Sequence, residues 1–307
     1  MPTRNTPRES ELAIAIIRTS PILGAVVTRS LCLLLCILPF SQLLHSAPAA
    51  AQGPAGGASP RKLIALTFDD GPRPYVLVGR KAEEGGPAPG LLELLDRENV
   101  KATFFVMGFR LAKSADDYCR KIDVGMNCRE AAAELHRRGH EIENHTYGHG
   151  PFSRMKKRYG EEWILNDIDR ASRIVQSVTG ERTHYVRPPE WDLWPEIREK
   201  IEARGFAVMM KSNKTFKEPP AREDVDTQDY VFTNLPESKS PVETLRNYVL
   251  ERIAQREKRG VYTHVLVFHE LPVSTAALGT LIPELKQRGY QFLTLRDYMK
   301  AVSPAAK

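Results

Sequence analysis

Short apolar runs alternate with longer amphipathic stretches along most of the chain. The runs are rich in β-branched and aromatic residues and predict strands, whereas the stretches repeat apolar residues at helical spacing. Repeated strand and helix units predict a parallel sheet covered by helices. Seven strands over about 240 residues favour an α/β fold of the distorted (β/α) barrel type, with seven or eight strands, over an open sheet. The expected strands are 63–68, 102–107, 140–144, 184–187, 206–210, 264–268 and 291–294, and the expected helices are 91–98, 128–138, 160–178, 194–203, 241–258 and 275–288.

The N-terminal part of the chain breaks this pattern. Residues 30–40 form an apolar run that is too short to span a bilayer, which takes roughly 20 residues. Arg18 and Arg29 precede the run, and small residues follow it up to Ala51. This order of basic, apolar and small segments is typical of a secretory leader. We therefore expect residues 1–51 to be a signal peptide.

Three further segments are expected after the leader. We expect a flexible tether at 52–60, a folded domain at 61–300 and a tail at 301–307. The mature protein would be exported to the periplasm or the extracellular space. Cleavage after Ala49 and an uncleaved signal anchor are the alternatives. No later segment is apolar enough to cross a membrane, so we expect no membrane span in the mature chain.

The composition is that of an ordinary globular protein. The 307 residues are 27% charged and 42% hydrophobic, with a formal net charge of +6. A nucleic-acid-binding protein gathers Lys and Arg along one face, whereas here charges of both signs are scattered. We expect no nucleic-acid partner and a monomeric protein.

Two of the four cysteines would leave with the leader. Cys119 and Cys128 remain, with eight residues between them. In an oxidising compartment they could form a local disulfide, and two unpaired thiols are the alternative. Without a C-x-x-C spacing they are poor zinc ligands.

Polar side chains gather where the expected strands end, which in a parallel barrel is a single rim. Two histidines of this set, His145 and His149, lie four residues apart, so one helical turn would place them on a common face. The set comprises Asp69 and Asp70, His145 and His149, Arg187, and His269 and Glu270, with Asp226 and Asp229 in a late loop.

These residue types suit metal-dependent hydrolysis. A catalytic zinc takes three imidazole or carboxylate ligands and keeps one position open, and His145, His149 and one aspartate provide such a set. Bound metal lowers the pKa of water towards about 7. A second carboxylate could then accept a proton, and His269 could protonate the leaving group.

The same segments resemble, in order, the five motifs of polysaccharide deacetylases, the NodB-like carbohydrate esterase family 4. They are T-F-D-D-G-P at 67–72, H-T-x-x-H at 145–149, R-P-P at 187–189, D-x-x-D-aromatic at 226–230 and L-V-F-H at 266–269. The resemblance covers about residues 62–300. It implies a NodB homology domain and metal-dependent removal of N-acetyl groups from the amino sugars of an acetylated polysaccharide, peptidoglycan or chitin-like.

The resemblance also implies a divalent metal and its ligands. Asp70, His145 and His149 would hold the metal, with zinc favoured and cobalt, nickel or manganese as alternatives.

Roles in proton transfer follow from the same resemblance. Asp69 would be the general base and Arg187 would orient it through a charge-assisted hydrogen bond. His269 would be the general acid, and Asp226 would keep its imidazole charged and oriented.

Three residues in two motifs depart from the family pattern. Glu190-Trp191 stands where the family usually has Tyr-Gly, and Tyr230 stands where it often has Trp. The backbone N–H of Glu190 could still donate to an oxyanion, with its carboxylate turned towards the groove. Pro189, Glu190, Trp191 and Tyr230 are the candidate substrate-binding residues.

The loops at 73–90 and 211–240 should lie at the same rim and set the substrate range. An O-acetyl esterase or another amide hydrolase would use the same machinery. A noncatalytic carbohydrate-binding relative is the alternative from a different class.

Overall fold

The computed structural model describes residues 60–80, 88–112, 125–235 and 240–303. The expected leader at 1–51 and nearly all of the tether at 52–60 therefore lie outside the described residues, as does most of the tail. The last described helix, α10, runs from Leu295 to Val302, two residues past the expected end of the domain.

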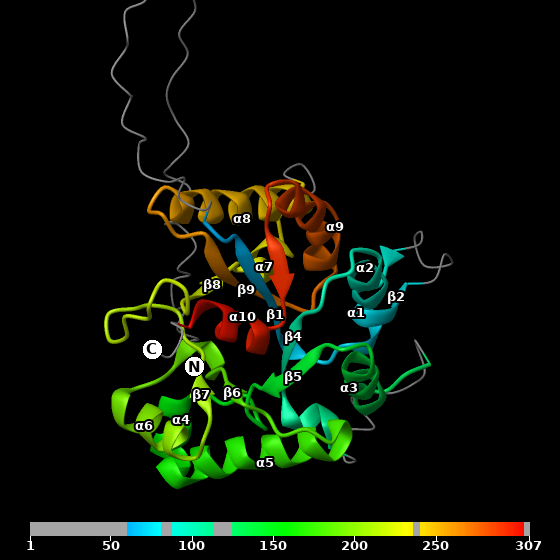
Figure 1. Ribbon diagram of the computed structural model, residues 1–307. Helices are drawn as coiled ribbons and strands as arrows, with labels where there is room; N and C mark the ends of the chain where they lie inside the picture. The colour runs from blue at the N-terminus through cyan, green and yellow to red at the C-terminus, as the bar shows by residue number, and fades with distance from the viewer. Residues whose placement is uncertain (1–59, 81–87, 113–124, 236–239, 304–307) are drawn as a thin grey trace, which may run out of the picture. The chain divides into compact units, whose positions relative to one another are not determined.

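The larger of two sheets in the described chain has eight strands (Figure 1). Its order is β7-β6-β5-β4-β1-β9-β8, with β10 beside the first residues of β1, and every pairing in it is parallel. The expected α/β barrel of seven or eight strands is confirmed, as a curled half-barrel. The strands are β1 (Leu63–Gly71), β4 (Thr103–Val106), β5 (Glu141–Asn144), β6 (Tyr185–Val186), β7 (Ala207–Val208), β8 (Asp224–Asp226), β9 (Thr263–His269) and β10 (Gln291–Leu293).

The two ends of this strand order meet. The N–H of Asp224 in β8 donates to the carbonyl oxygen of Met210, just after β7, at 3.4 Å. We call this junction of β7 and β8 the seam.

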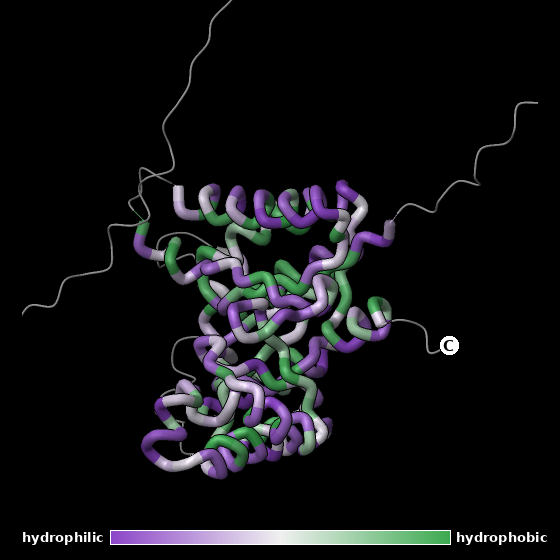
Figure 2. The backbone as a smooth tube through the Cα atoms, turned by 90° about the vertical axis from the view of Figure 1, so that its left-hand side faces the viewer, coloured by the Kyte–Doolittle hydropathy of each residue, from purple (hydrophilic) through white to green (hydrophobic). Residues whose placement is uncertain are grey.

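The six expected helices are present, with ends within three residues of the prediction. Hydrophobic and hydrophilic residues alternate along the outer helices, as amphipathic packing on a sheet requires (Figure 2). These helices are α2 (Leu91–Arg97), α3 (Cys128–Arg137), α5 (Glu161–Thr179), α6 (Pro195–Ala203), α8 (Pro241–Glu257) and α9 (Pro272–Gln287).

The structure adds short elements that the hydrophobic pattern did not predict. They lie largely in the two long loops and beside the polar rim. They are α1 (Pro74–Val78), the hairpin strands β2 (Gly79–Arg80) and β3 (Ala88–Pro89), η2 (Gly108–Leu111), α4 (Phe152–Tyr159), η4 (Pro189–Trp191), β8, α7 (Asp229–Phe232) and α10.

The alternation of side-chain direction along β1 places Asp69 inside the barrel. Successive side chains of a strand point to opposite faces. Leu63 and Ala65 pack inside, in a cluster with Tyr298 of α10, whereas Ile64 and Phe68 pack under the helices. Both faces are buried, which explains why β1 reads as a continuous apolar run. Asp69 continues the inward-facing series at the end of the strand.

Cys128 begins α3 and is disulfide-bonded. Cys119 lies outside the described residues, so the Cys119–Cys128 pairing remains a prediction.

Candidate active site

Arg187 follows β6, is fully buried and holds two carboxylates. Its Nη1 donates to Asp69 Oδ1 at 2.6 Å, and its Nε donates to Asp224 Oδ2 at 2.9 Å. The guanidinium carbon lies 3.9 Å from the centroid of the Phe105 ring. Burial raises the pKa of Asp224 to about 6, despite the opposing charge of Arg187. The contact with Asp69 is the one that the resemblance implies, whereas Asp224 was missed because its segment did not read as a strand.

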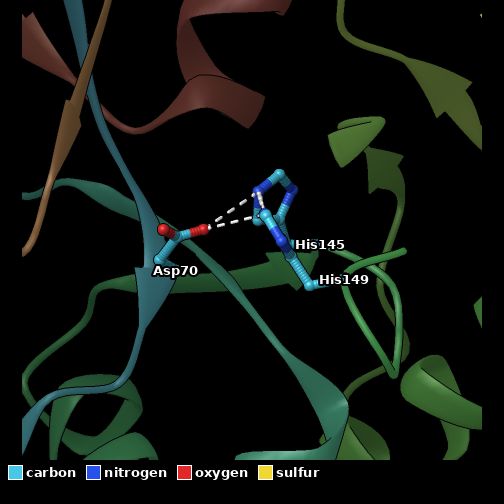
Figure 3. Close-up of side chains that lie close together, drawn as sticks. All are labelled: Asp70, His145 and His149. Atoms are coloured by element: carbon cyan, nitrogen blue, oxygen red, sulfur yellow. Dashed lines mark hydrogen bonds and ion pairs between the residues drawn. The ribbon is translucent and has the colours of Figure 1, made fainter. Parts of the chain in front are cut away.

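Asp70, His145 and His149 converge beside this pair (Figure 3). Asp70 Oδ1 lies 3.4 Å from His145 Nε2 and 3.0 Å from His149 Nε2, and the two Nε2 atoms are 3.2 Å apart. His145 Nδ1 lies 2.8 Å from the Arg187 carbonyl oxygen, to which it donates. That bond leaves the lone pair of His145 Nε2 facing the other two side chains.

The three donor atoms fit a small divalent cation. Tetrahedral ligands at zinc distances of about 2.0–2.2 Å from the metal are about 3.3–3.6 Å from each other. The separations of 3.0–3.4 Å in this cluster are close to that spacing. Burial alone would raise the pKa of Asp70, but hydrogen bonds and charge from His145 and His149 hold it well below its usual range. The Asp70 carboxylate is therefore ionised at neutral pH.

A turn rather than a helix brings the two histidines together. Thr146 and His149 have positive φ values of 64° and 53°. The Asn144 side chain accepts the Thr146 N–H at 2.8 Å, and Asp167 Oδ2 accepts the N–H groups of residues 147 and 148. The expectation of one helical turn was wrong, because these local hydrogen bonds replace the helical ones.

His269 ends β9 and is paired with Asp229. Its Nδ1 lies 2.7 Å from Asp229 Oδ1, while Asp229 Oδ2 accepts the His269 backbone N–H and the Ser274 hydroxyl, both at 2.6 Å. Burial lowers the pKa of His269, but the hydrogen bond and charge of the fully buried Asp229 outweigh it and raise the pKa to about 9. His269 is therefore an imidazolium at neutral pH.

The expected contact between Asp226 and His269 is not the one that the structure shows. Asp226 pairs with Val267 across β8 and β9, two residues short of His269. Its carboxylate instead accepts from Lys211 Nζ at 2.9 Å and from Trp191 Nε1 at 3.3 Å. The chain comes level with His269 only after the turn at residues 227 and 228. Asp229, which follows that turn, therefore makes the contact.

A family model described as polysaccharide deacetylase matches residues 56–209, which include the first three motifs. The chain belongs to the polysaccharide deacetylase family. One relative is a peptidoglycan-N-acetylglucosamine deacetylase of Listeria monocytogenes, 27% identical over 241 residues, with 78% of this chain and 39% of the relative covered. The chain thus spans about two fifths of that relative's length.

Other members of the family are covered more completely. A peptidoglycan-N-acetylglucosamine deacetylase of Bacillus cereus is 25% identical over 243 residues, which are 78% of this chain and 89% of the relative. Among solved structures, a family 4 acetyl xylan esterase from Clostridium thermocellum with a cobalt ion has 24% identity and a TM-score of 0.55. The match covers 78% of this chain and 91% of that one, and it supports the fold.

The substrate-side candidates of this polysaccharide deacetylase family member lie in η4 and beside His269. Glu190 and Trp191 both have positive φ, 55° and 58°, in the short helix η4. The Glu190 side chain is exposed, whereas Pro189 is buried. Tyr230 is half-exposed, and the edge of one ring meets the face of the other between Tyr230 and His269, with centroids 5.4 Å apart.

Glu270 is a further residue of the site for which the sequence suggested no role. It is fully buried, and its Oε2 accepts the Arg73 N–H at 2.6 Å. The Arg73 guanidinium in turn lies 3.5 Å from Asp70. A Cβ atom on Gly71 would lie 1.7 Å from Glu270 Oε1, which explains the glycine after Asp70. Glu270 therefore ties the end of β9 to the turn that follows Asp70.

Proposed function

We propose that the chain is an exported, metal-dependent hydrolase that removes N-acetyl groups from amino-sugar units of a polysaccharide, peptidoglycan or chitin-like. The observation that carries the proposal is the convergence of Asp70, His145 and His149 beside two proton-transfer pairs, Asp69 with Arg187 and His269 with Asp229. The names of the relatives support the reaction and the peptidoglycan class of substrate.

A divalent cation fits the three ligands, and we propose zinc, with cobalt, nickel or manganese as alternatives. When bound, such an ion supplies a Lewis acid that polarises an acyl carbonyl and makes water more acidic. His145 is oriented for this by the Arg187 carbonyl, and Asp70 by the loop that Glu270 holds.

The remaining steps belong to the side chains. Asp69, fixed by Arg187, accepts a proton from the attacking water as the oxygen–carbon bond forms. The backbone N–H of Glu190 would donate to the oxyanion. His269 then gives its proton to the amine nitrogen as the carbon–nitrogen bond breaks, so that acetate and a free amino sugar leave. Asp229 keeps His269 protonated until that step.

Export rests on the leader expected at residues 1–51. Among the described residues, no helix has both the length and the apolar character to cross a membrane.

Acetate release from a panel of glycans tests the function. We expect release from N-acetylated glucosamine oligomers or peptidoglycan, loss of release with a chelator and recovery with zinc or cobalt. Release only from O-acetylated xylan would favour the esterase alternative. If the protein bound glycans tightly but released no acetate even with added metal, the noncatalytic alternative would be favoured and the proposal contradicted.

The pH dependence tests the pairing of His269. Asp229, Asp69 and Asp70 face it with negative charge, and Tyr230 with its ring. Because the proton donor must be protonated, kcat/KM should fall as pH rises past about 9. Asp229→Asn should lower the pKa of His269, move this basic limb to lower pH and reduce the rate at pH 8.

Asp226→Asn is the matched control for this measurement. It removes a carboxylate three residues away that does not contact His269, so the basic limb should stay in place. If the basic limb of the pH profile moved in Asp226→Asn and not in Asp229→Asn, the pairing of Asp229 with His269 would be contradicted.

A further inference from the structure

A polar pocket of about 210 Å³ lies along the seam. Edge strand β8 forms one wall, the residues after β7 another and α8 a third. Its lining includes Lys211, Asp226, Gln228, Arg252 and Arg259. None of these residues has a role in the proposed chemistry.

Hydrogen bonds connect this pocket to the active-site rim. Asp226 binds both Trp191 and Lys211, and the Lys211 ammonium lies 5.1 Å from the centroid of the Trp191 ring. At the other side, Tyr248 links Gln228 and Arg252, with contacts of 3.4 Å and 3.1 Å to its hydroxyl. A continuous row of polar groups therefore leads from the arginine motif to α8.

The register of β8 and β9 places the row at a short distance from His269. Asp226 pairs with Val267, two residues before His269. Two residues of a strand span roughly 7 Å. A glycan whose acetylated sugar lies at His269 can thus extend along the rim to the side of the pocket formed by Asp226.

The charges of the pocket are not balanced. Lys211 is paired with Asp226, and the buried Arg256 is paired with Glu223 at 3.0 Å. Within the described part of the chain, the ion pairs include neither Arg252 nor Arg259, and both side chains are exposed. The Tyr248 hydroxyl fixes Nε of Arg252, and its ring lies 5.2 Å from the guanidinium carbon. The pocket thus presents an oriented guanidinium without a carboxylate partner.

The acidic residues of the pocket limit which anion fits. Guanidinium groups bind carboxylates and phosphates in a bidentate manner. Asp226, Asp224 and Glu223 also line this pocket, and like charges repel a dianion more than a monoanion. A singly charged carboxylate can bind the arginines, and the hydroxyl groups around it on a sugar can donate to the acidic residues.

We propose that this pocket is a subsite for a carboxylate-bearing sugar of the same glycan, with Arg252 as the residue that binds the carboxylate. Trp191, Asp226 and Lys211 form the side of the subsite nearest to the acetylated sugar. This inference rests on the proposed deacetylase function and adds an acidic polysaccharide as its substrate.

The test compares kcat/KM on two N-acetylated oligosaccharides of equal length, one neutral and one with a carboxylate on alternate sugars. We expect Arg252→Gln to lower the ratio of acidic to neutral kcat/KM about fivefold, mostly through KM, and added salt to reduce the same ratio in the unmodified protein. Arg259→Gln is a second variant in the same pocket and should lower the ratio in the same direction. Lys258→Gln removes an equal charge at the end of the same helix, outside the pocket, and should leave the ratio unchanged.

The outcomes separate this inference from the proposed function. If the unmodified protein releases acetate from both substrates but Arg252→Gln and Arg259→Gln leave the ratio unchanged, the subsite is wrong and the function stands. Release from neither substrate contradicts the function itself. A phosphate-bearing oligosaccharide that is preferred to the carboxylate and loses the preference in Arg252→Gln would overturn the choice of a carboxylate.

Discussion

Replacing Asp69 with asparagine is expected to lower acetate release about a thousandfold, since a positioned general base contributes roughly 10²–10⁴ to a rate. The amide has nearly the same shape as the carboxylate and can still accept from Arg187 Nη1, but it cannot take a proton from water. Metal content should not change, because Asp69 is outside the ligand cluster. Steady-state kinetics with metal analysis of the same samples measures both effects.

A matched control separates this effect from a general loss of structure. Asp169→Asn removes a carboxylate paired with Arg204 at 3.3 Å on the outer helix α5, and it should keep both activity and metal. If Asp69→Asn retained more than a tenth of the unmodified rate, Asp69 would not be the base.

Replacing His149 is expected to remove metal and activity together. Asparagine is the suitable substitute because His149 has a φ of 53°, a conformation that asparagine tolerates better than most residues. Replacing a residue that only supports a ligand lowers metal affinity by up to about 100-fold. His149→Asn removes one of the three proposed ligands itself, so the affinity for zinc should fall by more than that. Zinc titration by calorimetry measures the affinity, and acetate release measures the consequence.

His145 is less suitable for this test because it is buried and bonded to the Arg187 carbonyl, so its loss would also disturb the base. His136→Asn is the matched control, because it removes an imidazole from the outer helix α3, outside the cluster. Unchanged zinc affinity in His149→Asn would show that Asp70, His145 and His149 do not form the metal site.

The central strands could be predicted because burial on both faces leaves a clear apolar run. β1 and β9 are such strands. The polar residues near their carboxyl ends, Asp70 and His269, were correctly expected at one rim. The edge strand β8 could not be predicted in this way. Its three residues include two acids, and the group that compensates Asp224 is Arg187, 37 residues earlier in the chain.

The choice between Asp226 and Asp229 shows a different limit. Both acids belong to the same short motif, and spacing alone does not say which one reaches His269. The answer depends on the register of β8 against β9 and on Gln228, whose φ of 53° turns the chain into α7. Glu270 was likewise visible in the sequence, but its contact with the Arg73 N–H depends on how two distant loops pack.

The double contact of Arg187 has a consequence for how the protein gains activity during folding. One guanidinium orients the Asp69 carboxylate and also holds Asp224, which belongs to the strand that completes the barrel at the seam. A chain in which β8 has not yet docked would contain every motif residue and still lack a correctly restrained base. For the proposed hydrolase, activity is therefore coupled to the docking of β8 at the seam.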